Sequence, residues 1–129
     1  MPLMDKQAAY QLPALRLAFI GDTICDLLVR TELMFSTSSI KEMHVRATGT
    51  VNAVSQAAML DAIGHLLTAD ETDIVKRARN SHPGHSIPQA ASREEYMKAT
   101  AFEALMGYLY LTGQMRRAQT LFQLSRVKE

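Results

Sequence analysis

Two helical stretches that are apolar except at a few positions limit most strongly how this chain can fold. The first runs from Leu15 to Leu28 and contains Leu17-Ala18-Phe19-Ile20-Gly21-Asp22. Asp22, Asp26 and Arg30 recur every four residues, so they share one narrow stripe of a helix that we expect to be buried nearly all round. An acid in such a helix requires a partner, which is a neighbouring arginine, a hydrogen-bond network or a cation.

The second stretch, Ala99 to Tyr110, again holds a single carboxylate, Glu103, in an apolar helix. Thr100 and Gly107 are three and four residues from Glu103, so we expect its face of the helix to be open. A solvated stripe in which Asp26 pairs with Arg30 is sufficient to explain the first stretch alone. A second acid in the same kind of setting favours a functional interpretation of both acids.

Length and composition predict one soluble domain that spans residues 1–129. The 14 basic and 13 acidic residues give a net charge of +1, so any nucleic-acid binding requires a local basic cluster. Cys25 is the only cysteine; it excludes an internal disulfide and fits a reducing compartment as a small buried residue. The chain shows no signal-peptide pattern and no bilayer-spanning run, so we expect a cytoplasmic protein without a membrane partner.

Local signals predict helices throughout and no strands. We expect a helical turn at Asp5–Gln11 and helices at Pro13–Phe35, Ile40–Leu67, Asp70–Arg79, Ser92–Thr112 and Met115–Val127. Capping boxes open three of them, at Ser39 and Glu42, Thr68 and Glu71, and Ser92 and Glu95. We expect the last helix to face the core with Met115, Ala118, Leu121, Phe122 and Leu124.

Two irregular segments interrupt this pattern. Thr48-Gly49-Thr50 is the expected break in the longest helix, and Asn80–Ser92 is the expected long loop. The predicted fold class is therefore all-α, a compact bundle of five to seven helices.

The stretches around the two acids resemble the two catalytic motifs of the ribonuclease III domain. The residues that carry this resemblance are Leu17-Ala18-Phe19-Ile20-Gly21-Asp22 and Phe102-Glu103-Ala104-Leu105-Met106-Gly107. Val75-Lys76-Arg77-Ala78-Arg79-Asn80 and the stretch from Tyr96 to Tyr110 further resemble the short bacterial form, Mini-ribonuclease III, which lacks the double-stranded-RNA-binding domain. The resemblance covers the chain from Leu15 to Gly113.

This resemblance implies a helical bundle of the ribonuclease III endonuclease-domain type. It also implies Mg²⁺-dependent hydrolysis of phosphodiester bonds in double-stranded RNA, with Asp22 and Glu103 as the catalytic residues and metal ligands. The two helices that carry these acids must then pack face to face. The family role is maturation of large-subunit (23S) ribosomal RNA, and we expect a ribosomal protein or a shaped substrate to add selectivity.

The chain departs from the larger family at two acid positions. Full-length relatives have a Glu four residues before the first motif acid and an Asp three residues before the second, where this chain has Ala18 and Thr100. This departure leaves open an alternative function, a catalytically silent homodimeric helical module that binds RNA or protein. The retained pair Asp22 and Glu103 speaks against that alternative, because a binding module gains nothing from two acids facing phosphate.

The resemblance also implies an RNA-binding cluster and a homodimer. The expected RNA contacts are Lys76, Arg77, Arg79, Asn80 and His82. Without the resemblance, this basic run also fits a helix end that complements the helix dipole. Phe19 matches the family's motif phenylalanine, which inserts into a socket on the partner subunit; an ordinary core aromatic is the other interpretation.

Overall fold

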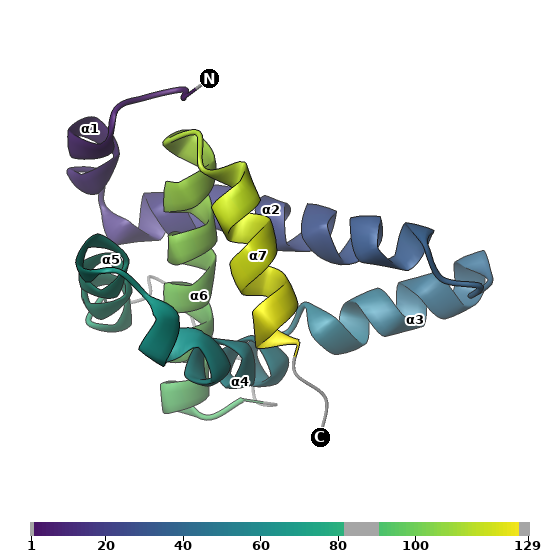
Figure 1. Ribbon diagram of the computed structural model, residues 1–129. Helices are drawn as coiled ribbons and strands as arrows, with labels where there is room; N and C mark the ends of the chain where they lie inside the picture. Colours follow the sequence, from purple (N-terminus) through teal and green to yellow (C-terminus); the bar gives the residue numbers. More distant parts are fainter. Residues whose placement is uncertain (1, 82–90, 127–129) are drawn as a thin grey trace.

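The computed structural model describes residues 2–81 and 91–126, which form seven α-helices and a short 3₁₀ turn with no strand among them (Figure 1). The elements are α1 (Lys6–Tyr10), α2 (Ala14–Met34), α3 (Ile40–Thr50), α4 (Ala53–Ile63), η1 (Gly64–Leu66), α5 (Ala69–Arg79), α6 (Arg93–Leu111) and α7 (Met115–Ser125). The predicted all-α bundle is confirmed. None of these helices combines the length and apolarity that crossing a bilayer requires.

The three predicted capping boxes are all present, and they fix where α3, α5 and α6 begin. In each, a hydroxyl oxygen accepts the backbone N–H three residues on, and the glutamate there accepts the N–H of the capping residue. The predicted break at Thr48-Gly49-Thr50 is displaced to Val51 and Asn52. Asn52 causes this displacement, because its Oδ1 accepts the N–H of Ser55 at 2.9 Å and so starts α4.

Helix α6 is the centre of the bundle, and α1, α2, α4, α5 and α7 all pack against it (Figure 1). Most of its apolar residues are almost inaccessible to solvent, among them Phe102, Leu105, Met106 and Leu109. Helix α7 buries Ala118, Leu121 and Phe122 as predicted. Leu124 is 46% exposed, so the prediction for that residue is wrong.

The second half of α2 and the whole of α3 extend beyond the other helices as an arm (Figure 1). Helix α3 buries only Ala47. Large apolar side chains remain exposed along this arm and at the start of α2: Leu15, Phe19, Leu27, Met34, Phe35, Ile40 and Val45. The expectation that α2 is buried nearly all round is therefore wrong, because the bundle covers only one of its two apolar faces.

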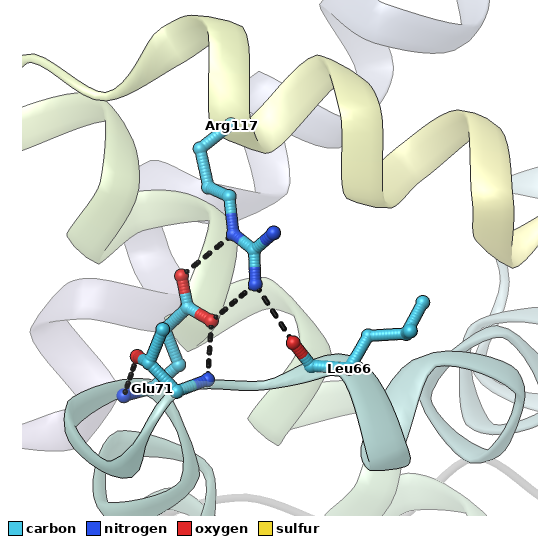
Figure 2. Close-up of polar contacts among 4 residues, drawn as sticks. Leu66, Glu71 and Arg117 are labelled. Atoms are coloured by element: carbon cyan, nitrogen blue, oxygen red, sulfur yellow. Dashed lines mark hydrogen bonds and ion pairs between the residues drawn. The ribbon is translucent and has the colours of Figure 1, made fainter.

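A partly buried ion pair joins α5 to α7 (Figure 2). Glu71 is 3% exposed, and its two carboxylate oxygens accept from Nε and Nη2 of Arg117 at 3.0 and 2.9 Å. The same Nη2 donates to the carbonyl oxygen of Leu66 at 2.9 Å. Burial raises the pKa of Glu71, but the bonds from Arg117 and from the Thr68 backbone outweigh it, so the pKa lies below its ordinary 4.5.

Candidate functional site

The candidate site lies where α2 crosses α6, and two glycines set the distance between these helices. A Cβ atom at Gly21 would lie 1.6 Å from the carbonyl oxygen of Glu103, and one at Gly107 would lie 2.0 Å from that of Leu17. Any other residue at either position would force the backbones apart. The expected open face around Glu103 is therefore wrong, because Gly107 is packed directly against α2.

This backbone contact brings together the two acids that the sequence singled out. Asp22 follows Gly21 and is exposed, whereas Glu103 is partly buried. Burial raises the pKa of Glu103 to about 8. The hydrogen bond that the protonated Glu103 carboxyl group donates to the Asp22 carboxylate, and repulsion by the charge of Asp22, also raise this pKa. The predicted packing of these two helix faces is confirmed.

The oxygens of this acid pair are the ligand type that Mg²⁺ prefers, and Mg²⁺ is commonly held by one or two carboxylates together with water and substrate phosphate. Within residues 2–81 and 91–126, no group of three or more His, Cys, Asp or Glu side chains is arranged to hold a metal ion. Asp22 and Glu103 can supply two oxygen ligands to such a cation. Repulsion between neighbouring carboxylates, which a divalent ion relieves, supports the same fit.

The positions of the two missing family acids are filled by buried residues. Ala18 is 7% exposed and Thr100 is 8% exposed. The Thr100 hydroxyl donates to the carbonyl oxygen of Tyr96 at 3.0 Å, within its own helix. Asp26, one turn after Asp22, forms the predicted ion pair with Arg30 at 3.1 Å, and both side chains are about half exposed. The carboxyl groups at the crossing are thus those of Asp22 and Glu103.

Sequence reasoning missed Gln56, which contacts the acid pair from α4. It is 4% exposed, and its Nε2 donates to Oε2 of Glu103 at 3.5 Å. Its side chain also bonds the thiol of Cys25. Burial, and then the charge of Glu103, raises the pKa of that thiol far above its ordinary value, so Cys25 is an inert buried thiol. The sequence signal for Gln56 was its place beside the apolar residues Ala57, Met59 and Leu60.

A basic groove of about 590 Å³ lies between α5 and α6. It is lined by Lys76, Arg79, Asn80, Arg93, Glu94 and Met97. Three predicted RNA-binding residues therefore meet there, and Arg93 joins them although its position in the sequence gave no such signal. Arg93 precedes Glu103 by ten residues of the same helix, or about 15 Å along its axis. His82 lies outside the described residues.

The structure places Arg77 apart from this groove. Its guanidinium carbon lies 4.6 Å from the centroid of the Tyr10 ring, and its Nη2 donates to the carbonyl oxygen of Leu12 at 3.5 Å. Its Nε is buried and has no hydrogen-bond partner among the described residues. Arg77 therefore holds the N-terminal segment against α5, a role that depends on tertiary packing.

Phe19 is 83% exposed, which excludes its interpretation as a core aromatic. A second groove, of about 250 Å³, lies between α2 and α3 on the arm. It is lined by Arg30, Leu33, Met34, Ile40, Met43, His44 and Ala47. The surface of α2 therefore carries both the exposed Phe19 ring and, together with α3, a largely apolar groove.

Comparisons with known proteins agree with this arrangement. The sequence model of the family described as "Ribonuclease III domain" matches residues 15–114. The chain is 41% identical over 113 residues to Mini-ribonuclease 3 of Symbiobacterium thermophilum, covering 87% of this chain and 86% of that protein. It is 36% identical over 124 residues to Mini-ribonuclease 3 of a Thermoanaerobacter species, covering 95% and 87%. A crystal structure of a protein from Fusobacterium nucleatum superposes with a TM-score of 0.80 at 28% identity, covering 88% of this chain and 90% of that one.

Proposed function

We infer the function of this protein from the premise that the chain belongs to the ribonuclease III domain family and is an endoribonuclease. We propose that it hydrolyses phosphodiester bonds in double-stranded RNA and that Asp22 and Glu103 hold the Mg²⁺ ion that this reaction uses. The observation that carries the proposal is the contact of the two carboxyl groups at the crossing of α2 and α6.

Each acid has a distinct part in this proposal. Asp22 is exposed, so its carboxylate is accessible to an incoming phosphate and to solvent. With its pKa raised to about 8, Glu103 favours the protonated form near neutral pH, and it would release this proton to water on holding a cation. A bound Mg²⁺ ion supplies an activated water molecule and neutralises charge that develops on the phosphate.

The basic groove supports double-stranded RNA as the substrate. Lys76, Arg79 and Arg93 present three cationic side chains on one surface, and Asn80 adds an amide. A-form RNA is recognised chiefly through phosphates and 2′-hydroxyl groups, which are what such side chains bind. We assign Arg77 to the scaffold, because its guanidinium group is engaged by Tyr10 and Leu12.

We further propose that the protein acts as a homodimer. Phe19 would leave water by entering the apolar groove between α2 and α3 of a second copy, and the exposed apolar residues of the arm would be covered at the same time. A two-fold dimer places two acid pairs on one surface, which suits a duplex whose strands are also related by local two-fold symmetry.

The cellular role we propose is maturation of large-subunit ribosomal RNA in the cytoplasm. With a net charge of +1 and a small basic groove, the protein should hold a free duplex weakly at physiological salt. A ribosomal protein bound to the precursor RNA would then supply additional selectivity. Equal cleavage of any long duplex without partners would contradict this part of the proposal.

The deciding experiment is cleavage of a labelled RNA hairpin by the wild type, Asp22→Asn and Glu103→Gln, with Mg²⁺ and with a chelator. Both variants and the chelator should lower the rate by at least about a thousandfold without loss of folding. Asp26→Asn is the matched control, because it removes an acid one turn away that is paired with Arg30. A wild type that binds hairpins but never cuts them would favour the silent binding module.

A further inference from the structure

The structure places the amide of Gln56 next to Glu103, in a helix whose other buried residues are all apolar. Gln56 belongs to the first turn of α4, and the other buried residues of this helix are Ala57, Met59, Leu60 and Ile63. At 4% exposure, Gln56 has lost almost all contact with water. A buried amide costs free energy unless it is hydrogen-bonded, and an apolar residue would fill this position at lower cost.

The partners of this amide belong to the two helices that form the candidate site. Nε2 of Gln56 donates to Oε2 of Glu103 in α6 at 3.5 Å. The same side chain bonds the thiol of Cys25, which follows Asp22 by three residues on α2. Gln56 thus connects α4 to both helices immediately behind the acid pair.

We propose that Gln56 is a positioning residue that fixes the rotation of the Glu103 carboxyl group and thereby strengthens the binding of a divalent cation between Glu103 and Asp22. This inference rests on the proposed function, in which these two acids are the metal ligands.

The reason lies in the freedom of a glutamate side chain. The terminal torsion of Glu is broad, so packing of the α6 backbone alone leaves the carboxylate plane undetermined. One oxygen of Glu103 is held from α4 by Gln56, and the carboxyl group also bonds Asp22 on α2. Partners of this kind, which orient a ligand without touching the metal, commonly change metal affinity or activity by ten- to a hundredfold when removed.

The contact between Nε2 of Gln56 and Oε2 of Glu103 is at the long end of the range for a hydrogen bond. At 3.5 Å the bond is weak by itself, so we assign it a role in orientation and not in overall stability.

The test compares the wild type with Gln56→Met, which keeps the side-chain length and removes the amide. Gln56→Asn keeps the amide but is one methylene too short to reach Glu103, so it tests the same contact if the first variant folds poorly. Thr112→Val is the control. It removes a different buried polar group, the Thr112 hydroxyl at the C-cap of α6, which donates to the carbonyl oxygen of Tyr108 at 2.7 Å.

Two readouts are taken for each protein. The first is the rise in melting temperature as Mn²⁺ or Mg²⁺ is titrated into the RNA-free protein, which reports metal affinity without catalysis. The second is hairpin cleavage against metal concentration, with KM for the RNA measured at saturating metal. For both Gln56 variants, the metal concentration that gives the half-maximal rise in melting temperature or the half-maximal cleavage rate should be about ten times higher than for the wild type. The KM for the RNA should be unchanged. Thr112→Val should keep wild-type metal dependence even where its metal-free melting temperature is lower.

Wild-type metal dependence in either folded Gln56 variant would overturn this inference, and a loss of melting temperature alone would assign Gln56 to packing. A different result would contradict the proposed function itself. In that result, metal neither stabilises the wild type nor is needed for its cleavage of RNA, and Asp22→Asn behaves as the wild type does.

Discussion

Gly21 of α2 touches the main chain of Glu103 in α6, so closely that a Cβ atom at position 21 would lie 1.6 Å from the Glu103 carbonyl oxygen. The partner in this contact is backbone, which cannot rotate aside as a side chain can. Gly21→Ala must therefore separate the two helices and move Asp22 away from Glu103.

We expect Gly21→Ala to lower the free energy of unfolding by about 3 kcal/mol or more, at the upper end of overpacking costs. Cleavage should fall more than stability explains, because the acids no longer meet. Gly49→Ala is the control, since a Cβ atom at Gly49 has no neighbour within 4 Å; it should be neutral or stabilising by up to about 1 kcal/mol. Urea unfolding and hairpin cleavage measure both effects. Equal stabilities for the two variants would contradict the close contact.

The acid pair should make the metal-free protein less stable as the pH rises. Glu103 has a pKa of about 8 in the fold against an ordinary 4.5, so between these values the folded state holds a proton that the unfolded chain has released. The free energy of unfolding therefore falls as the pH rises from 4.5 to 8, and it becomes constant above pH 8. Glu103→Gln should remove this loss. Its free energy of unfolding should exceed that of the wild type by up to about 4 kcal/mol at pH 8 and by little at pH 4.5.

Urea unfolding in the presence of chelator, at several pH values in that window, tests this expectation. Parallel pH curves for the wild type and Glu103→Gln would show that burial and Asp22 do not hold the proton on Glu103.

The ion pair between Glu71 and Arg117 should contribute to stability above the ordinary carboxyl pKa. Arg117→Met leaves the buried Glu71 carboxylate without its guanidinium partner and should lower the free energy of unfolding by about 2 kcal/mol. This loss is smaller than is usual for a buried pair, because the Arg117 side chain is 33% exposed. Because the pKa of Glu71 is lowered by folding, the contribution is present above pH 4.5 and is lost as the pH falls below it.

Arg116→Met is the matched control for this pair, since Arg116 is the exposed neighbour of Arg117 on α7. Thermal unfolding at pH 7 and pH 3 should show a deficit for Arg117→Met that shrinks at the lower pH. A deficit of equal size at both pH values would assign the effect to lost packing of the arginine stem.

Phe19→Ala should weaken self-association without weakening the fold, because the ring is 83% exposed in the single chain. Removing a central aromatic anchor costs about 2 kcal/mol of association, or roughly thirtyfold in the dimer dissociation constant. Sedimentation across a concentration series measures this change. Leu124→Ala, an exposed apolar residue on α7, should leave association unchanged. A wild type that stays monomeric at high concentration would contradict the dimer.

The basic groove should control the salt dependence of RNA binding. Lys76→Ala, Arg79→Ala and Arg93→Ala should each weaken duplex binding and reduce the slope of log affinity against log salt by about one. Fluorescence anisotropy in the Asp22→Asn background measures binding without cutting. Arg116→Ala is the control for lost surface charge. Arg77→Ala should instead lower stability and keep the slope, because Arg77 contacts Tyr10 and Leu12.

The sequence predicted the features that depend on short-range chemistry. The capping boxes locate the starts of α3, α5 and α6, because the side chain and the amide that it caps are three residues apart. Asp22 and Glu103 could be singled out because an acid is conspicuous in an apolar helix. The break before α4 lies at Val51 and Asn52 because Asn52 caps the first turn of α4, whereas Gly49, on which the prediction rested, stays within α3.

The features that sequence reasoning missed depend on which surfaces meet. Gln56 contacts Glu103 only through the packing of α4 on α6, and Arg77 leaves the basic cluster only because α1 lies beside α5. The exposed face of α2 has the same origin. Its apolar residues look identical in the sequence whether a neighbouring helix covers them or not.

The two glycines that join α2 to α6 also bear on how the enzyme should respond to heat. Because main-chain atoms set the separation of the acids, that separation cannot drift through side-chain repacking while the two helices stay in contact. Activity should therefore rise with temperature until the bundle itself melts, and the inactivation midpoint should coincide with the unfolding midpoint.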